Sequence, residues 1–322
     1  MVRSSIMGKD GLTLAVIASL VMTAVAFFVD TPPLLTADAG ICFPSPNNWP
    51  MPAGLGWIFN TAMIGVTALL LSILNKEYRI VPNSDSVFLE MFLILAVSNV
   101  WISGIFTASS IMAVINLACI LILFSCYDRN NSSKDIFLIA TMMSIGSMFQ
   151  YAFIFIAPVF LIGTFIVKCF DIKVLAAYLM GLIAPYWIIL GFGIVAPGEL
   201  HFPSLSNIFT FASENDMFFG LLNVWLTIGI GIILSLANSM QTYAGNSKKR
   251  ACNAVLNVLG IFILLCIIFD FANLVTYLAT AYFFTAIQIG RIFELGNIRR
   301  PEMWLLGIFS IYLILFILTV AT

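Results

Sequence analysis

The sequence predicts an all-α integral membrane protein, a polytopic bundle of about eleven transmembrane helices. Of its 322 residues, 61% are hydrophobic and only 9% are charged, and the mean hydropathy is +1.08. Soluble domains carry about 25% charged residues, because a surface in water needs polar cover. The apolar solvent of this chain is therefore expected to be lipid.

The length of the apolar runs predicts where the helices cross. A bilayer core about 30 Å thick needs about 20 apolar residues per helix. The third and fourth spans come from one run between Val87 and Ser125 that is too long for one crossing, and Trp101–Ser110 supplies the turn. The fifth span is short and ends at a polar break, Ser147–Gln150. The predicted spans are 11–29, 52–74, 87–102, 109–125, 136–149, 151–167, 174–195, 217–240, 254–269, 272–290 and 303–320.

The basic residues give this map a direction. Cytoplasmic loops of membrane proteins are enriched in Lys and Arg. All 14 basic residues of the chain fall before the first span or after an even-numbered one, and the opposite loops hold none. We therefore expect a cytoplasmic N-terminus, an external C-terminus, and a single transmembrane domain over residues 1–322 with no soluble domain.

The start of the chain allows another interpretation. A basic beginning, an apolar stretch and Ala37-Asp38-Ala39 resemble a secretory signal with its cleavage site. The apolar stretch is longer than the roughly 7 to 15 apolar residues of a usual signal peptide. This length favours an uncleaved first span.

Charge and cysteine usage bear on cofactors and partners. The net charge of −1 gives no reason to expect nucleic-acid binding. The six cysteines show neither a CxxC pair nor a metal-ligand spacing, so no cofactor or metal site is predicted. A divalent cation held by the outer acids is the remaining alternative.

The predicted outer loops collect acids and the single histidine, without any base. The first outer loop holds Asp30 and Asp38 in a proline-rich stretch, and a later one holds Glu199 and His201. Acids without bases on one face can bind a divalent cation or act as a general base. The alternative is that the positive-inside bias removed the cations and left ordinary loop acids.

Polar residues inside the spans also have two interpretations. Mid-span amides either bond neighbouring helices together or line the cavity of a carrier. Glu90 lies about one turn from the cytoplasmic end of its span and is expected to reach the headgroups. No Lys or Arg lies in a span interior, which argues against a proton relay but not against passage of a neutral solute. The amides are Asn60, Asn99, Asn116, Gln150, Asn223, Asn257 and Gln288, and the prolines that should kink helices are Pro158 and Pro185.

Four stretches carry a resemblance to a known family. Asp135–Phe137, Ser144–Gly146, Phe149–Pro158 and Gly181–Tyr186 resemble an uncharacterised multi-pass membrane family of Bacteroidota, and the similarity extends to Asn75–Tyr78. The resemblance implies a multi-pass protein of the bacterial inner membrane. It implies no activity.

The central stretch also resembles, more distantly, the GT-C superfamily of polyprenyl-phosphate-sugar glycosyltransferases. Those enzymes typically carry a catalytic acid in the first external loop, so the resemblance implies that Asp30 or Asp38 is the general base for the acceptor hydroxyl. The chain departs from the pattern because Gln150 stands where a cation would sit and no outer loop contains Lys or Arg. The residues expected to line the substrate pocket are Gln150, Tyr151, His201 and Glu199.

The sequence is thus compatible with three functions. The first is a GT-C-like enzyme acting on lipid-linked glycans of the cell envelope, with the bilayer and a polyprenyl-phosphate-linked sugar as partners. The second is a non-catalytic membrane subunit or scaffold of an envelope complex, which would bind other membrane protein subunits. The third is a channel or carrier for a neutral solute, which requires a polar cavity near the midplane.

Overall fold

The computed structural model describes residues 9–29, 40–81, 86–201, 218–241, 246–295 and 301–321. Within these ranges the chain forms twelve α-helices and no strand. Each of the predicted spans overlaps a helix, and the third contains two, α3 and α4. The helices are α1 (Lys9–Phe27), α2 (Ala53–Tyr78), α3 (Val87–Val97), α4 (Val100–Ser103), α5 (Ala108–Ser125), α6 (Ser133–Phe149), α7 (Ala152–Ile166), α8 (Ile172–Gly191), α9 (Phe218–Gln241), α10 (Ser247–Phe269), α11 (Leu274–Leu295) and α12 (Pro301–Ala321).

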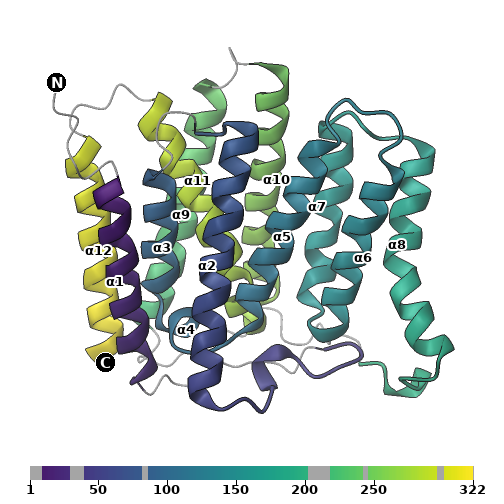
Figure 1. Ribbon diagram of the computed structural model, residues 1–322, viewed down its shortest axis with the longest axis horizontal. Helices are drawn as coiled ribbons and strands as arrows, with labels where there is room; N and C mark the ends of the chain where they lie inside the picture. Colours follow the sequence, from purple (N-terminus) through teal and green to yellow (C-terminus); the bar gives the residue numbers. More distant parts are fainter. Residues whose placement is uncertain are drawn as a thin grey trace.

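Seven of these helices are long and apolar enough to cross a membrane, namely α2, α5, α8, α9, α10, α11 and α12. Shorter apolar helices lie at α1, α3 and α7. The chain is thus a multi-pass helical membrane protein. Figure 1 shows the helices side by side, running alternately between two ends of one bundle.

The two ends of the bundle differ in charge. We call the end that holds the α5–α6 and α7–α8 turns the basic end, because Arg129, Lys134, Lys168 and Lys173 lie in or beside these turns. The other end holds residues 40–52, the α6–α7 turn and the α10–α11 turn (Figure 1). We call it the acidic end, because Glu199 and Asp270 lie there. α1 begins at the basic end and α12 finishes at the acidic end.

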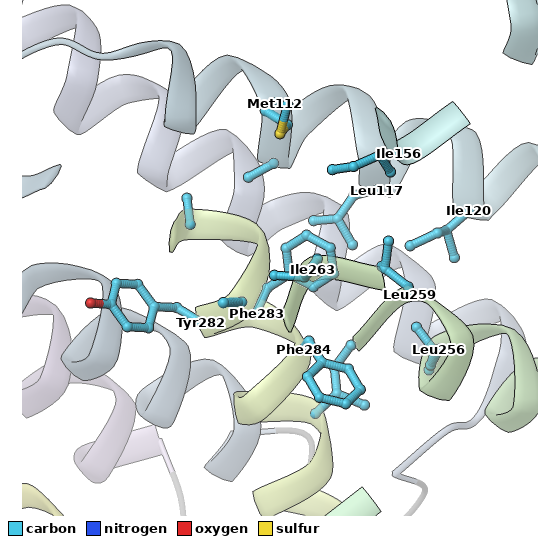
Figure 2. Close-up of a cluster of buried hydrophobic side chains, with 14 of the residues drawn as sticks. Met112, Leu117, Ile120, Ile156, Leu256, Leu259, Ile263, Tyr282, Phe283 and Phe284 are labelled. Carbon is cyan, nitrogen blue, oxygen red and sulfur yellow. The ribbon is translucent and has the colours of Figure 1, made fainter. Parts of the chain in front are cut away.

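Helix α11 is the centre of the bundle. In an apolar stretch of 18 residues within Phe271–Phe293, 94% of the residues are buried, against 22% in the corresponding stretches of α8 and α12. Helix α11 packs against α9, α3, α5 and α10. Figure 2 shows Phe283 and Phe284 of α11 among aliphatic side chains of α5 and α10. A β-carbon at Gly260 of α10 would lie 2.3 Å from Phe284 Cζ, so only glycine lets this ring approach so closely.

Helices α6 and α8 form a tightly packed pair beside this core. A β-carbon at Gly181 of α8 would lie 2.6 Å from the Phe137 carbonyl oxygen of α6, so the small residue sets the spacing of the two backbones. Pro158 and Pro185 both lie inside uninterrupted helices, α7 and α8. Both helices therefore continue through their prolines, which packing against neighbouring helices allows.

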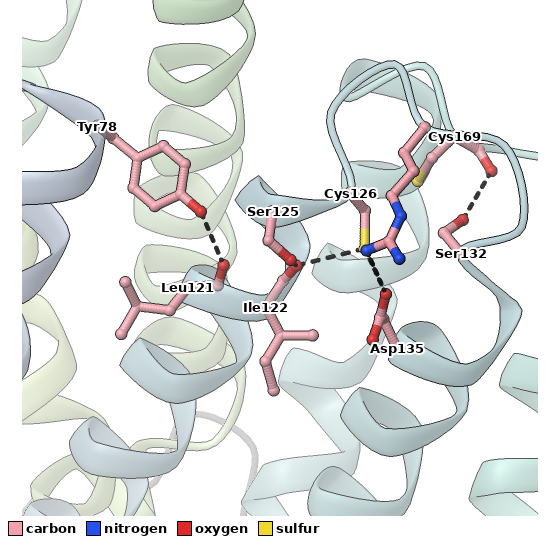
Figure 3. A network of polar contacts seen from close by, with 9 residues as sticks. Tyr78, Leu121, Ile122, Ser125, Cys126, Ser132, Asp135 and Cys169 are labelled. Carbon is pink, nitrogen blue, oxygen red and sulfur yellow. Dashed lines mark hydrogen bonds and ion pairs between the residues drawn. The ribbon is translucent and has the colours of Figure 1, made fainter.

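The turns at the basic end are joined by hydrogen bonds, shown in Figure 3. The Tyr78 hydroxyl donates to the Leu121 carbonyl at 3.3 Å, which ties α2 to α5. Arg129 and Asp135 form the one ion pair among the described residues, at 3.4 Å. Because the Arg129 side chain is 59% exposed and the Asp135 side chain is 34% exposed, this pair contributes at most about 1 kcal/mol.

Glu90 was expected to reach the headgroups because it lies near a helix end, but it does not. Its residue is only 5% exposed, and its Oε1 has no hydrogen-bond partner among the described residues. The side chain points into the bundle, where α3 packs against α11, α1 and α2. The expectation failed because it used distance along the helix and not the face on which Glu90 lies.

Candidate functional site

The structure describes four of the six residues predicted for the site. Asp30 and Asp38 lie outside the described residues, so their predicted catalytic role stays a prediction. The described chain resumes at Gly40 and runs along the acidic end (Figure 1). Gln150, Tyr151, Glu199 and His201 all lie at this end, which makes it the candidate site. They do not all meet: the first two belong to one polar network and the last two lie beside it.

Gln150 stands where α6 stops and α7 has not begun. Its backbone is extended, with φ −153° and ψ 108°, and its side chain is completely buried. Its Oε1 accepts from Ser45 Oγ at 2.7 Å, and its Nε2 donates to Asn273 Oδ1 at 3.0 Å and to Thr276 Oγ1 at 3.3 Å. The amide thereby links the loop before α2 to the start of α11. It is fully engaged with protein groups.

The next residue, Tyr151, contacts the carboxylate of Asp270, which was not among the predicted site residues. Its hydroxyl donates to Asp270 Oδ1 at 2.9 Å and accepts from Asn273 Nδ2. Asn273 Nδ2 also lies 2.9 Å from Asp270 Oδ1, and the Tyr277 hydroxyl donates to Asp270 Oδ2 at 2.8 Å. One carboxylate therefore has three donors, all of them uncharged.

The environment of Asp270 sets its chemistry. The residue is half-buried between the end of α10 and the 3₁₀ turn Phe271–Asn273. Burial raises the pKa of the Asp270 carboxyl above its ordinary value of 3.8, although the three hydrogen bonds oppose the rise. A raised pKa makes the carboxylate a stronger base. Since Oδ2 accepts only from Tyr277 among the described groups, it retains a lone pair for a further donor or a cation.

Residues 40–49 cover this network. The backbone N–H groups of Cys42 and Phe43 both donate to the Met148 carbonyl at 3.0 Å, and the Phe43 ring stacks on Phe149 with centroids 5.1 Å apart. A β-carbon at Gly40 would lie 1.6 Å from the Phe43 carbonyl oxygen, so the tight loop requires glycine there. The loop closes over the polar break that begins at Ser147.

Glu199 and His201 approach the network through the backbone. The His201 N–H donates to the Ile41 carbonyl at 3.0 Å, and Ile41 packs against Tyr151. The His201 ring nitrogen Nδ1 lies 2.8 Å from the Glu199 carbonyl, while Glu199 Oε2 accepts from the Ala196 N–H at 3.3 Å. Both side chains are exposed. They flank the loop over Tyr151 and do not contact Asp270 through any described hydrogen bond.

The mid-span amides bond one helix to another. Asn116 Nδ2 donates to Thr280 Oγ1 at 3.1 Å, which joins α5 to α11. Asn223 Nδ2 donates to Ser98 Oγ at 3.0 Å, and Gln288 Nε2 donates to Asn257 Oδ1 at 3.2 Å. These contacts agree with the packing role expected for amides in a bilayer.

The residues that sequence reasoning missed are Asp270, Asn273, Tyr277 and Ser45. The available signal was the spacing of Asp270, Asn273 and Tyr277, which places three polar groups on consecutive turns beside a helix junction. Nothing local marks Ser45, whose partner is 105 positions away. Among the described residues, no group of three or more His, Cys, Asp or Glu side chains is placed to hold a metal ion.

No family model, no curated protein and no solved structure matches this chain. Both resemblances noted in the sequence therefore stay hypotheses, and the comparisons identify no family.

Proposed function

We propose that this chain is a GT-C-like glycosyltransferase of the bacterial inner membrane that acts on lipid-linked glycans of the cell envelope. The proposed topology has about eleven spans with a cytoplasmic N-terminus and an external C-terminus. It makes the basic end cytoplasmic and the acidic end external. The gathering of described Lys and Arg residues at the basic end supports this orientation.

The observation that carries the proposal is the Asp270 carboxylate at the acidic end. It is half-buried, bonded to two tyrosine hydroxyls and one amide, and has a raised pKa and a free lone pair on Oδ2. These are properties of a general base that takes a proton from a hydroxyl. Asp30 and Asp38 remain the bases that the resemblance implies.

In the proposed reaction, the carboxylate accepts the proton of a sugar or lipid hydroxyl. The hydroxyl oxygen forms a bond to the anomeric carbon of the donor sugar, and the bond from that carbon to the polyprenyl phosphate breaks. The phosphate leaves with the bonding electron pair. Asn273 and the two tyrosines hold the carboxylate in place, since each is bonded to it directly.

The test is transfer by the purified protein in proteoliposomes that contain a radiolabelled polyprenyl-phosphate sugar. Asp270→Asn keeps the size of the side chain but removes the base, so we expect a loss of about 10²-fold or more in rate. Asp30→Asn and Asp38→Asn decide which outer carboxylate acts. Asp128→Asn is the matched control, because Asp128 lies at the basic end with a positive φ of 52° that asparagine tolerates. Transfer at the wild-type rate by all four variants would overturn the assignment of the base. No transfer by the wild type would overturn the proposed activity.

The second candidate is a non-catalytic subunit or scaffold of an envelope complex. The complete engagement of the Gln150 amide favours it, because a residue expected to contact substrate is instead bonded on all sides. This candidate predicts that the native protein purifies with partner chains in fixed ratio. It also predicts that Asp270→Asn leaves the function of the complex unchanged.

A further inference from the structure

A second helix interruption inside the bundle lies between α3 and α5. Helix α3 stops at Val97, the four-residue helix α4 follows, and α5 begins at Ala108. Helix α4 contacts α1, α2, α11 and α12, and its four residues are all buried. A break in a helix frees backbone and side-chain polar groups, which must then find partners in a place without bulk water.

Three buried side-chain atoms around this break have no hydrogen-bond partner among the described residues. They are Asn60 Oδ1, Asn99 Nδ2 and Thr107 Oγ1. Asn60 and Asn99 are 0% and 1% exposed, so bulk solvent does not satisfy them in the folded protein. One atom is an acceptor, one is a donor and the hydroxyl can be either.

Rotation of the amides cannot remove this mismatch. Asn99 Oδ1 accepts from the Trp101 N–H at 3.0 Å as the N-cap of α4, so a flipped amide would put a donor against a donor. Asn60 Nδ2 donates to the carbonyl groups of Ile102 and Ser103, so its flip would put an acceptor against two acceptors. The free donor of Asn99 and the free acceptor of Asn60 are therefore fixed by what their other halves bind.

A further polar group borders the site. The Tyr282 hydroxyl receives a weak hydrogen-bond interaction from the Asn99 side chain, but Asn99 Nδ2 has no partner in full hydrogen-bond geometry among the described residues. The same hydroxyl donates to Asn223 Oδ1 at 3.1 Å, and Asn223 in turn donates to Ser98. Polar groups that face each other beyond hydrogen-bond distance are often bridged by water.

We propose that the α3–α4 break is an internal water-binding site, with ordered water accepting from Asn99 Nδ2 and donating to Asn60 Oδ1. A buried polar group left unpaired costs about 1–3 kcal/mol, and buried water typically makes about three hydrogen bonds to such groups. Water supplies both a donor and an acceptor, which this pair requires. The inference does not depend on the proposed glycosyltransferase activity, because no residue of the Asp270 network takes part.

Water-edited solid-state NMR of the full chain in lipid nanodiscs, with asparagine labelled by ¹⁵N, tests the proposal. Asn223 is the matched control, because it is equally buried but both halves of its amide are bonded, Nδ2 to Ser98 and Oδ1 to Tyr282. We expect the Asn99 side-chain amide to receive magnetisation from water several-fold faster than the Asn223 amide. The variants Asn99→Ser and Asn223→Ser assign the two signals, and serine keeps a side-chain oxygen that can cap α4. Equal transfer to both amides would overturn the proposal.

An experimental density map is the second measurement, and it does not require either variant to fold. In a map that resolves ordered water, we expect a peak within about 2.7–3.2 Å of Asn99 Nδ2. A map that shows water at other buried polar groups but none at Asn99 and Asn60 would refute the site.

Discussion

Replacement of Gln150 by leucine separates a packing role from a role in substrate binding. The side chain makes three hydrogen bonds and is completely buried, so Gln150→Leu removes all three and keeps a side chain of similar volume. Ser45→Ala removes only the first of them. Ser125→Ala is the control, since the Ser125 hydroxyl is exposed and donates to the Ile122 carbonyl of its own helix.

The expected magnitudes follow from the contacts. Interhelical hydrogen bonds in membrane proteins contribute about 0.6 kcal/mol each, with a maximum of about 1.7 kcal/mol. Gln150→Leu also leaves Asn273 Oδ1 without its Gln150 donor, and an unpaired buried acceptor costs about 1–3 kcal/mol. We expect Gln150→Leu to lower the free energy of unfolding by about 2–4 kcal/mol, and Ser45→Ala by about 1 kcal/mol. The double variant should cost less than the sum, because both changes remove the same bond.

The assay is unfolding in mixed micelles of increasing sodium dodecyl sulfate content, followed by circular dichroism, beside the transfer assay on the same samples. Ser125→Ala should stay within about 0.5 kcal/mol of the wild type. One result would refute this account of Gln150: wild-type stability of Gln150→Leu together with lost transfer. The amide would then contact substrate, as the GT-C resemblance implied.

Three further predictions concern charge, packing and sidedness. Because the pKa of Asp270 is raised in the fold, the native state binds its proton more tightly than the unfolded state does, so the free energy of unfolding should fall as pH rises above about 3.8 towards the folded pKa. Asp270→Asn should reduce this slope. An identical pH profile for the variant and the wild type would contradict the assignment. Gly181→Ala should destabilise the protein by about 1–3 kcal/mol, because the new methyl group meets the α6 backbone, whereas Gly229→Ala, which meets nothing within 4 Å, should be neutral or stabilising in the same unfolding assay. A cysteine placed by Ser204→Cys in a Cys42→Ala background should react with a membrane-impermeant maleimide on intact spheroplasts, and reaction only after lysis would invert the topology.

The positions of the helices were predictable because each depends on local composition. A run of apolar residues must form a helix in lipid wherever it lies in the fold, since unbonded backbone groups are too costly there. The break at Gln150 was predicted for the same reason: polar residues interrupt the run between α6 and α7. The turn in the run from Val87 was also placed correctly, since α4 and the loop before α5 lie there.

The arrangement of the candidate site was not predictable, because it depends on long-range contacts. The partners of Gln150 come from Ser45 and from Asn273 and Thr276, more than 100 positions away on either side. Helix periodicity says which residues share a face but not which helices are neighbours. For the same reason the sequence assigned Glu90 to the headgroups, although its face turns towards the bundle.

The charge of the acidic end limits what the proposed enzyme can bind without help. A hydroxyl-bearing acceptor suits Asp270 and its two tyrosines, since it can donate to the free lone pair of Oδ2. A polyprenyl phosphate does not, because phosphate is usually held by Arg or Lys and none contacts the described network. A carboxylate beside a phosphate would repel it unless a cation stood between them.

The donor is therefore expected to bind together with a divalent cation, for which carboxylate and phosphate oxygens are the preferred ligands. Transfer in proteoliposomes should be lost on treatment with EDTA and restored by Mg²⁺ or Mn²⁺. The Asp270→Asn variant should need more of the metal for half-maximal rate if Oδ2 is one of its ligands, while Asp128→Asn should need the same amount as the wild type. Full transfer in EDTA would show that the phosphate is neutralised by protein groups away from this network, and the donor pocket would then have to lie elsewhere than at Asp270.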